Sequence, residues 1–328
     1  MRDLQLNVRT AQWRLKSPFR ISRGVKTHAE TIIVELTDGT HVGRGECTPY
    51  ARYGESVESV AGQINGVQAT PDCLANSNSL QNALPPGAAR NALDCALLDL
   101  QAKASGVRTA TRFGLQPKPV TTAYTLSLDS PEAMFEAARA AAARPLLKIK
   151  LGSGPEDEER LRSVRRGAPD SRLIVDANEG WSENDLDRNL SIAVECKVAL
   201  IEQPLPTDGD EALERFSSPI PLCADESVHT REDLDRLARR YSVINVKLDK
   251  TGGLTEAMAL ISEARARDLT IMVGCMVASS LAMAPAVLAA QGAAFVDLDG
   301  PLLLAEDFEP ALRFDGSLID PPDPALWG

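Results

Sequence analysis

Residues 146–151 read LLKIKL, residues 172–177 read RLIVDA and residues 199–204 read ALIEQP. Each run is short and apolar, as buried strands are, and each carries a charged residue close to its C-terminal end. Between the first two runs, residues 156–166 place apolar side chains at helical spacing. Short buried strands that alternate with amphipathic helices predict a parallel sheet built from βα units.

The same pattern extends over most of the chain. Strand-like runs recur about every 25 residues, the length of one βα unit, at residues 121–128, 146–151, 172–177, 199–204, 221–226, 243–248, 270–275 and 294–299. Helices are expected at residues 131–143, 156–166, 184–195, 230–240 and 254–267. This repeat predicts a modified (β/α)8 TIM barrel. The alternative, a doubly wound open sheet, would need a glycine-rich GxGxxG turn, and none follows any run.

The two ends of the chain do not follow the repeat. Residues 31–36 and 41–46 alternate like two strands joined at Asp38–Gly39, and residues 88–104 have helical spacing with Gly106 as the C-cap. The Gly- and Pro-rich C-terminus shows little helical pattern, so the last barrel helix is expected to be missing. We therefore predict an α+β capping domain over residues 1–115, a barrel over residues 116–305, and a tail over residues 306–328 that returns to the cap.

Composition excludes several partners. The net charge of the 328 residues is −11 and no basic run occurs, which disfavours nucleic acid and acidic membrane surfaces. The N-terminus lacks the apolar core of a signal peptide, and no apolar run could span a bilayer. Six cysteines without a CxxC pair predict reduced thiols in a cytoplasmic protein. The sequence leaves the oligomeric state open, and a homo-oligomer is compatible with it.

Polar residues gather where the predicted strands end. The active site of such barrels lies at these ends, and the residues concerned are Thr125, Ser127, Lys148, Lys150, Asp176, Asn178, Glu202, Asp225, Lys247, Asp249, Cys275, Asp297 and Asp299. Many are two positions apart, so their side chains share one face, which we expect to be the barrel interior. Any one of them could belong to a core salt bridge, but unpaired buried charges are costly and the whole ring indicates a site.

Three carboxylates in this ring suggest a metal. Asp176, Glu202 and Asp225 end successive strands and lie 26 and 23 residues apart, one βα unit each. Neighbouring strands lie about 5 Å apart, so the carboxylates would converge and repel one another unless a cation lay among them. Oxygen ligands without His or Cys favour Mg²⁺ over Ca²⁺ or zinc.

Two lysines would flank this metal. Lys150 lies on the second strand and Lys247 on the sixth, which places them across the barrel from each other. A nearby divalent cation lowers the pKa of an ammonium group toward the range of a general base, although each lysine could also simply pair with a ligand carboxylate. With a metal to stabilise an enolate, two such lysines would racemise or epimerise the carbon beside a carboxylate. A leaving group at the β-carbon would instead give elimination or cycloisomerisation.

Several motifs carry a resemblance to a known family. The runs LLKIKLG, VDANEGW, IEQPL, ADES and NVKLDKTGG resemble the enolase superfamily in its muconate-lactonising subgroup. The resemblance extends over the whole chain, including FRISRG, GRGECTPYARYGES and ALDCALLDLQAKASG. It implies one Mg²⁺ held by the three carboxylates, Lys150 and Lys247 as the acid and base catalysts, and Lys148 as a group that neutralises the substrate carboxylate.

Further motifs resemble the dipeptide epimerases of that subgroup. The run DLDGP implies that Asp297 and Asp299 hold a protonated amine, although they could merely pair with a barrel lysine. The run GCMVASS implies that Cys275 faces the pocket, although it could be a small core residue. Thr125 is a further candidate for contact with the peptide. FRISRGVKT and GECTPYARYGES resemble enzymes that act on L-Ala-D/L-Glu from murein breakdown. An acidic second residue would need a cation, and Arg23 or Lys26 is available unless both are merely solvated.

Other functions remain open at this stage. N-acylamino acid racemase and o-succinylbenzoate synthase would use the same catalytic ring, but their substrates lack the free amine that two aspartates would bind. A Schiff-base aldolase would use Lys150 as a covalent nucleophile. A barrel that only binds peptides would have no use for the lysines and the carboxylates together.

Overall fold

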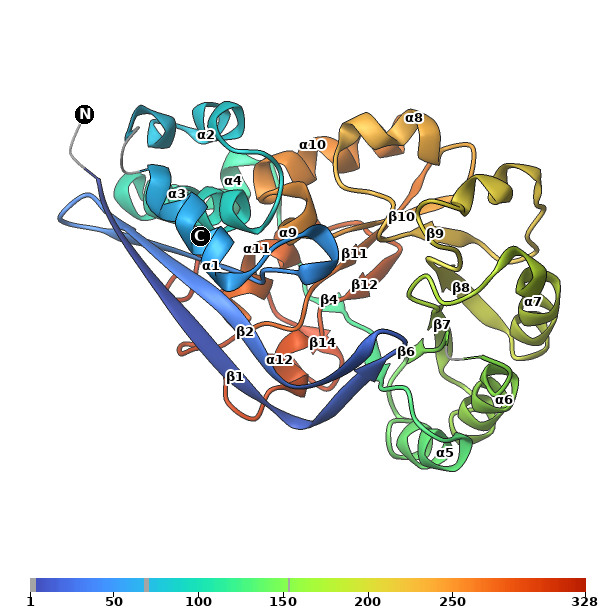
Figure 1. The fold of residues 1–328 in the computed structure, drawn as a ribbon. Coiled ribbons are helices and arrows are strands. Elements are labelled where there is room, and N and C mark those ends of the chain that lie inside the picture. The colour runs from blue at the N-terminus through green and yellow to red at the C-terminus, as the bar shows by residue number, and fades with distance from the viewer. Residues whose placement is uncertain (1–3, 68–70, 153) are drawn as a thin grey trace.

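The computed structural model describes residues 4–67, 71–152 and 154–328. Figure 1 shows an antiparallel cap, drawn in blue, beside a parallel sheet that curves into a near-barrel. The cap sheet has the order β1-β2-β3 and the parallel sheet runs from β5 to β12 in chain order. The predicted fold class is therefore confirmed.

The cap is a long hairpin with a third strand and a covering helix. Its elements are β1 (Gln5–Ile21), β2 (Gly24–Thr37), β3 (Val42–Cys47), α1 (Val57–Gly66), α2 (Ser77–Ala83), α3 (Ala88–Ser105) and α4 (Thr109–Arg112). The two strands predicted around Asp38–Gly39 and the helix that ends at Gly106 are confirmed. A Cβ on Gly43 or Gly45 would lie 2.2 or 2.1 Å from carbonyl oxygens of α3, so only glycine permits this close packing.

Eight parallel strands form the second sheet. They are β5 (Tyr124–Leu126), β6 (Leu146–Lys150), β7 (Arg172–Asp176), β8 (Val198–Glu202), β9 (Leu222–Ala224), β10 (Val243–Val246), β11 (Thr270–Gly274) and β12 (Phe295–Asp297). The seam between β12 and β5 is bridged by the Ala123 N–H, which donates to the Val296 carbonyl at 2.8 Å, and by the Leu298 N–H, which donates to the Thr122 hydroxyl at 2.8 Å.

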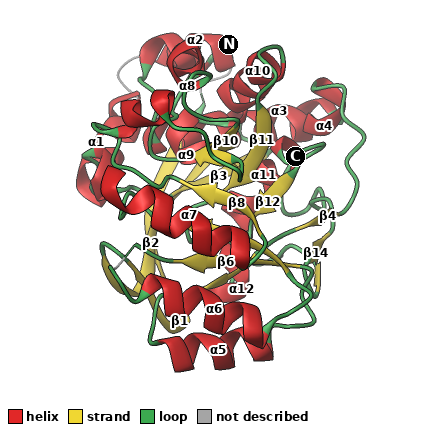
Figure 2. Cartoon of the chain, turned by 90° about the vertical axis from the view of Figure 1, so that its right-hand side faces the viewer, coloured by secondary structure: helices red, strands yellow, loops and turns green. Residues whose placement is uncertain are grey.

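Helices cover the outside of this sheet unevenly. The longer ones are α5 (Pro131–Ala140), α6 (Asp157–Gly167), α7 (Leu186–Glu195), α10 (Leu254–Arg265) and α11 (Ser280–Ala289), and Figure 2 shows the first three side by side. The other helical segments of the described barrel residues are short: η4 (Glu183–Asp185), η5 (Asp210–Arg215), η6 (Arg231–Asp233), α8 (Leu234–Leu237) and α9 (Leu248–Thr251). The helix predicted over residues 230–240 is thus shorter than expected. A single turn, α12 (Gly300–Leu303), replaces the last helix.

The C-terminal tail crosses back to the cap. β13 (Phe314–Asp315) pairs with β14 (Leu318–Ile319), which pairs with β4 (Val120–Thr121). The indole N–H of the fully buried Trp327 donates to the Cys95 carbonyl in α3 at 3.0 Å. These contacts agree with the predicted return of the tail, while the domain boundaries at residues 115 and 305 stay predictions. In the described residues, no helix is long and apolar enough to cross a membrane.

The barrel interior explains where the polar residues lie. One apolar residue from each strand or its approach forms a small plug, made of Ala123, Leu146, Ile174, Leu200, Cys223, Val243, Met272 and Phe295. Because side chains two positions apart share a face, the next inward position after Leu146 is Lys148, after Ile174 it is Asp176, and after Phe295 it is Asp297. The sequence period thus places a polar layer directly above the apolar plug.

Candidate active site

Three carboxylates meet at the centre of this polar layer. Asp176 and Glu202 are the last residues of β7 and β8, and Asp225 directly follows β9. One carboxylate oxygen from each lies within 4.8 Å of the others, and all three side chains are buried. Burial and the neighbouring Asp176 raise the pKa of Glu202 to about 8, which shows how strongly the three charges compete. Buried, converging, oxygen-only ligands fit a hard divalent ion such as Mg²⁺.

Four ammonium groups surround these carboxylates in the described residues, those of Lys148, Lys150, Lys247 and Lys250. Lys148 Nζ lies 2.7 Å from Glu202, 3.1 Å from Asp176 and 2.7 Å from Asp297. At one side, Lys150 Nζ lies 2.6 Å from Asp176 Oδ2, and at the other, Lys247 Nζ lies 2.7 Å from Asp225 Oδ2. Lys150 ends β6 and Lys247 follows β10, with three strands between them. The predicted placement of these two lysines on opposite sides of the triad is therefore what the structure shows.

The pKa of Lys247 differs from the expectation. Burial lowers the pKa of Lys247, but the Asp225 carboxylate and other groups outweigh it, so the pKa lies well above its usual value. The predicted depression is absent from the protein alone. It would need the added positive charge of a metal, which would also compete for Asp225.

One aspartate of the predicted ring lies elsewhere, and one lysine was missed. The chain turns into α9 directly after Lys247, so the two-residue period ends and Asp249 faces the cap. Its carboxylate accepts hydrogen bonds from the Thr48 N–H at 3.0 Å and the Asn91 side chain at 2.8 Å. Lys250, one helical turn after Lys247, takes the inward place and lies 2.6 Å from Asp225 Oδ1. The spacing of three in the motif KLDK was the signal for it.

The two aspartates after β12 lie next to the triad. Asp297 Oδ2 pairs with Lys148, while Asp297 Oδ1 is buried without a hydrogen-bond partner in the described residues. Asp299 Oδ2 accepts from the Thr125 N–H at 2.6 Å. Burial, and then the charge of Asp297, raise the pKa of Asp299 to about 7. Pairing with a barrel lysine, the alternative raised by the sequence, thus occupies one oxygen of Asp297, and the Thr125 N–H occupies one oxygen of Asp299. Asp297 Oδ1 is left for a cationic ligand.

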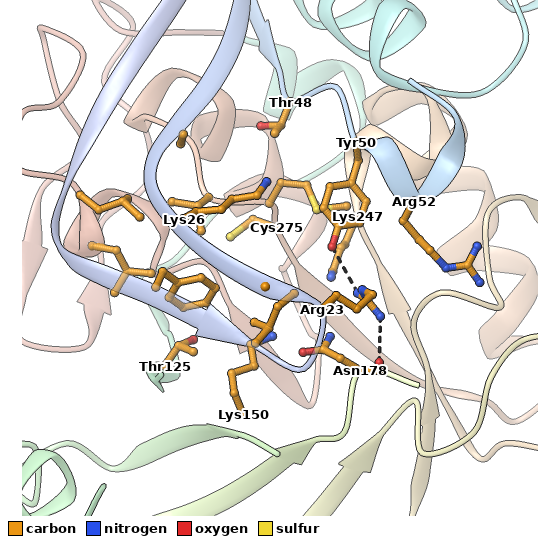
Figure 3. Close-up of a pocket in the computed structure, with 18 of the residues that line it drawn as sticks. Arg23, Lys26, Thr48, Tyr50, Arg52, Thr125, Lys150, Asn178, Lys247 and Cys275 are labelled. Atoms are coloured by element: carbon orange, nitrogen blue, oxygen red, sulfur yellow. Dashed lines mark hydrogen bonds between the residues drawn. The ribbon is translucent and has the colours of Figure 1, made fainter. Parts of the chain in front are cut away.

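A cavity of about 380 Å³ lies above these groups, between the barrel and the cap (Figure 3). Every residue predicted to bind substrate lines it, as do both predicted catalytic lysines: Arg23, Lys26, Thr125, Lys148, Lys150, Lys247, Cys275, Asp297 and Asp299. Asp225 also reaches its wall. The cavity size is that of a pocket for a small molecule.

The cap contributes lining residues that sequence reasoning missed. Tyr50 and Tyr53, from the loop after β3, and Phe19, near the tip of the hairpin, all line the cavity. The two tyrosines in GECTPYARYGES were the available signal for this loop. Glu226, beside Asp225, was also missed; its side chain is 1% exposed and pairs with Arg23 at 2.7 Å.

The two cap cations occupy different environments. Arg23 pairs with Glu226 and Glu179 and also donates to the Asn178 carbonyl at 2.8 Å. Lys26 lies with Nζ 5.4 Å from the centre of the Tyr50 ring, and in the described part of the chain no carboxylate pairs with it. The sequence alone did not distinguish them.

Comparison with known proteins adds to this geometry. Residues 3–114 match the family described as mandelate racemase / muconate lactonizing enzyme, N-terminal domain, and residues 133–325 match the family described as enolase C-terminal domain-like. The chain belongs to the enolase superfamily. Within this superfamily it is an isomerase of the racemase and epimerase class.

Two relatives in the superfamily have similar identity to the chain. L-Ala-D/L-Glu epimerase of Escherichia coli strain K12 is 46% identical over 305 residues, which cover 92% of this chain and 95% of that protein. N-acetyl-D-glutamate racemase of a Pseudoalteromonas species is 46% identical over 299 residues, which cover 90% of this chain and 95% of that protein.

Solved structures of the enolase superfamily match over almost the full length. An enolase family member from Agrobacterium tumefaciens with homology to dipeptide epimerases, solved with sodium and L-Ala-L-Glu, has 51% identity and a TM-score of 0.97, covering 99% of this chain and 100% of that one. A dipeptide epimerase from Cytophaga hutchinsonii, solved with Mg and D-Ala-L-Val, has 28% identity and a TM-score of 0.89, covering 97% and 92%.

Proposed function

We propose that the chain is a Mg²⁺-dependent dipeptide epimerase that inverts the α-carbon of the C-terminal residue, with L-Ala-D/L-Glu from murein peptides as the substrate. One observation carries this proposal. Lys150 and Lys247 flank the carboxylate triad from opposite sides, and the cavity they share also holds Asp297 and Asp299. A dipeptide supplies both groups that this arrangement suits, a carboxylate beside the reacting carbon and an ammonium group farther away.

The lysines would carry out the proton transfer. One removes the α-proton from one face of the substrate and the other returns a proton to the opposite face, which inverts the carbon. Asp176, Glu202 and Asp225 would hold one Mg²⁺ per subunit. The metal would supply positive charge beside the substrate carboxylate, where the negative charge of the enolate develops. Lys148, fixed between three carboxylates, would keep this crowded site compact and add to the positive field.

The aspartates after β12 would select a substrate with a free amine. Asp297 Oδ1 is buried without a hydrogen-bond partner in the described residues, and Asp299 lies beside it, anchored by Thr125. A protonated amine would satisfy both carboxylates with charge-assisted hydrogen bonds. Cys275 would form part of the wall nearby.

Asp299→Asn tests this amine site. An asparagine oxygen can still accept from the Thr125 N–H, so the fold should persist while the negative charge is lost. Removing a hydrogen bond to a charged group costs about 10- to 100-fold, so kcat/KM for L-Ala-L-Glu should fall by that factor. Turnover of N-acetyl-L-glutamate, which has no ammonium group, should not fall. An equal loss on both substrates would contradict the assignment.

A second candidate function has a specific observation in its favour. The N-acetyl-D-glutamate racemase is as similar to the chain as the L-Ala-D/L-Glu epimerase. The two neighbouring aspartates, Asp297 and Asp299, favour the dipeptide, because an N-acetyl group has no positive charge to balance their negative charges. If the unmodified enzyme turned over N-acetyl-glutamate with a higher kcat/KM than L-Ala-L-Glu, the racemase would replace the epimerase as the conclusion.

The acidic side chain of the second residue would be bound by Lys26. Arg23 is already neutralised by Glu226 and Glu179, whereas Lys26 lines the cavity without a paired carboxylate in the described residues. Lys26→Met should therefore raise KM for L-Ala-L-Glu by about 10-fold, with little change for L-Ala-L-Leu. The matched control is Lys118→Met, at the opposite end of the barrel, which should leave both unchanged. A similar effect of Lys26→Met on both dipeptides would contradict this role.

The direct test of the function is a dipeptide library incubated in D₂O with Mg²⁺ and read by mass spectrometry. Uptake of one deuterium at the α-carbon of the second residue is expected for L-Ala-L-Glu. No uptake in any dipeptide would refute the epimerase. Trapping of a protein adduct by borohydride with an aldehyde substrate, together with activity in EDTA, would favour the Schiff-base aldolase instead. We also propose a cytoplasmic location, which agrees with six unpaired cysteines.

A further inference from the structure

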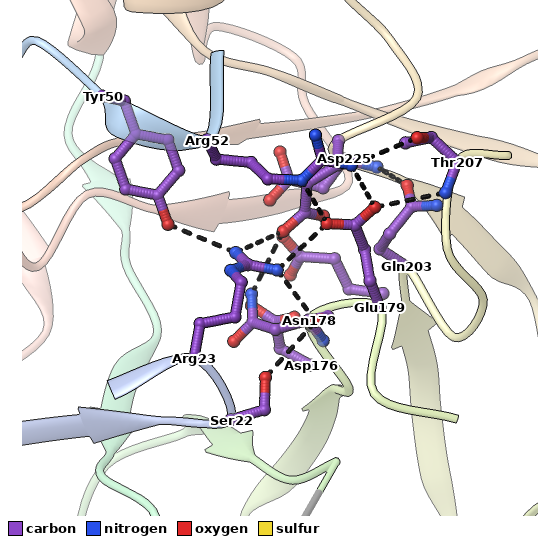
Figure 4. A network of polar contacts seen from close by, with 12 residues as sticks. Ser22, Arg23, Tyr50, Arg52, Asp176, Asn178, Glu179, Gln203, Thr207 and Asp225 are labelled. Carbon is purple, nitrogen blue, oxygen red and sulfur yellow. Dashed lines mark hydrogen bonds and ion pairs between the residues drawn. The ribbon is translucent and has the colours of Figure 1, made fainter. Parts of the chain in front are cut away.

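A network of alternating charges joins the cap to the barrel at the edge of the cavity. Its members are Arg23 and Arg52 of the cap and Glu179 and Glu226 of the barrel loops, here called the clasp (Figure 4). Glu179 does not line the cavity, although its neighbour Asn178 does. A role for Glu179 must therefore act through other residues.

Glu179 is the centre of the clasp. Arg52 binds its carboxylate with two hydrogen bonds, from Nε at 2.8 Å and from Nη2 at 2.7 Å, and Arg23 adds a third at 3.2 Å. The Thr207 N–H adds a fourth at 3.1 Å. Only 9% of the Glu179 side chain is exposed. The two-pronged geometry makes the pair more specific than a single contact, and its Glu179 end is shielded from water, while the Arg52 side chain is 38% exposed.

The two arginines come from two different cap segments. Arg23 lies at the tip of the β1–β2 hairpin, and Arg52 lies in the loop after β3. Both segments form the roof of the cavity, through Arg23 to Lys26 and through Tyr50 to Tyr53. Glu179 is thus one barrel residue that holds both roof segments at once.

The backbone beneath the clasp has a strained conformation that adds hydrogen bonds to the hairpin tip. Asn178 and Glu179 have φ angles of +45° and +64°, which non-glycine residues adopt rarely. This conformation directs the Asn178 carbonyl toward the hairpin tip, where it accepts hydrogen bonds from the Ser22 hydroxyl at 3.3 Å and from Arg23 at 2.8 Å. Asn178 and Glu179 follow Asp176 by two and three residues, so the contact that holds the roof is next to the carboxylate triad.

We propose that Glu179 is a positioning residue that holds both roof segments over the substrate. A closed roof keeps water from the reacting carbon and orients Lys26 and the cap tyrosines, which favours substrate capture. Loss of the Glu179 charge weakens capture and leaves proton transfer at the lysines unchanged. The kinetic part of this inference rests on the proposed function, but the structural part does not.

Glu179→Gln tests the inference with two readouts on the Mg²⁺-loaded protein. KM for L-Ala-L-Glu should rise about 10-fold, the loss of a charged hydrogen-bond partner, with kcat within twofold of the original. Backbone amides of residues 21–27 and 50–54 should exchange hydrogen for deuterium faster in the free protein. The matched control is Glu183→Gln, a 66% exposed carboxylate that lies 3.9 Å from Arg215, which should change neither readout.

A double-mutant cycle separates the clasp from general destabilisation. Arg52→Met and Glu179→Gln remove the same contact, so the double variant should raise KM no more than the larger single effect. Unchanged amide exchange at both segments in Glu179→Gln would overturn the inference. So would a fall in kcat at constant KM, because Glu179 would then act on the chemistry. If no dipeptide were turned over, the proposed function would fail, and amide exchange alone would still decide the clasp.

Discussion

Lys247→Gln is expected to lower epimerisation of L-Ala-L-Glu by about 10³-fold, and Lys150→Gln by a similar factor, the contribution typical of a positioned acid or base. Each variant removes one of the two groups that carry the proton. Inversion is therefore largely lost, while removal and return of the α-proton on one face of the substrate survives. The folded state should tolerate both changes. Asp225 keeps Lys250 at 2.6 Å when Lys247 is replaced, and Asp176 keeps Lys148 at 3.1 Å when Lys150 is replaced.

The surviving half-reaction is what distinguishes these lysines from structural ones. A single remaining lysine can still remove and return the α-proton on its own face, so one epimer should exchange its α-proton with D₂O and the other should not. The two variants should have opposite preferences between L-Ala-L-Glu and L-Ala-D-Glu. Proton NMR of each epimer in D₂O measures this directly.

A lysine outside the site provides the control for the exchange experiment. Lys118→Gln, far from the triad, should exchange both epimers normally. If both catalytic-site variants lost exchange from the same epimer, the lysines would not stand on opposite faces of the substrate. If either variant retained full epimerisation, that lysine would only balance the charge of a carboxylate.

The main elements of the fold were predictable because they follow local periods. The barrel strands alternate with helices, and the step from the plug residue Ile174 to Asp176 follows from a two-residue period. β1 was missed because only one of its 17 residues, Leu15, is buried, and its alternation of exposed and half-buried residues slips at residues 9–10 and 16–18. It is held by pairing with β2 and by a bridge from Leu15 to Leu304, contacts that no local period encodes.

The site residues also fall into those that follow from local periods and those that depend on long-range packing. The triad and its two lysines follow from the ends of strands, whose positions the sequence shows. Asp249 was misplaced because α9 begins immediately after Lys247 and changes the period from two to 3.6. Glu179 and Glu226 both pair with Arg23, more than 150 residues away, and Glu179 also pairs with Arg52, 127 residues away. The packing of the cap on the barrel sets these contacts, and the spacing within either part does not.

Glu202→Gln should abolish both turnover and the response of the protein to Mg²⁺. Glu202 is fully buried, its pKa is raised by burial and by Asp176, and a neutral amide would remove one of three charges that attract a divalent ion. A ligand that binds only the folded state raises Tm, so the original protein should melt a few degrees higher in saturating Mg²⁺ than in EDTA. The variant should melt at the same temperature in both, with turnover reduced at least about 10³-fold.

A second expectation concerns the melting temperature of the Glu202→Gln variant without Mg²⁺. Without Mg²⁺ the raised pKa of Glu202, about 8, keeps most of this carboxyl protonated at neutral pH. Glutamine resembles that neutral form, so in EDTA at neutral pH the variant should melt close to the original. The control is Glu256→Gln, a buried carboxylate that pairs with Arg231 at 3.0 Å away from the triad. It should lower Tm and keep the Mg²⁺ response. If the Glu202→Gln variant still gained stability from Mg²⁺, the ion would bind outside the triad. The two flanking lysines would then have no metal between them to stabilise an enolate.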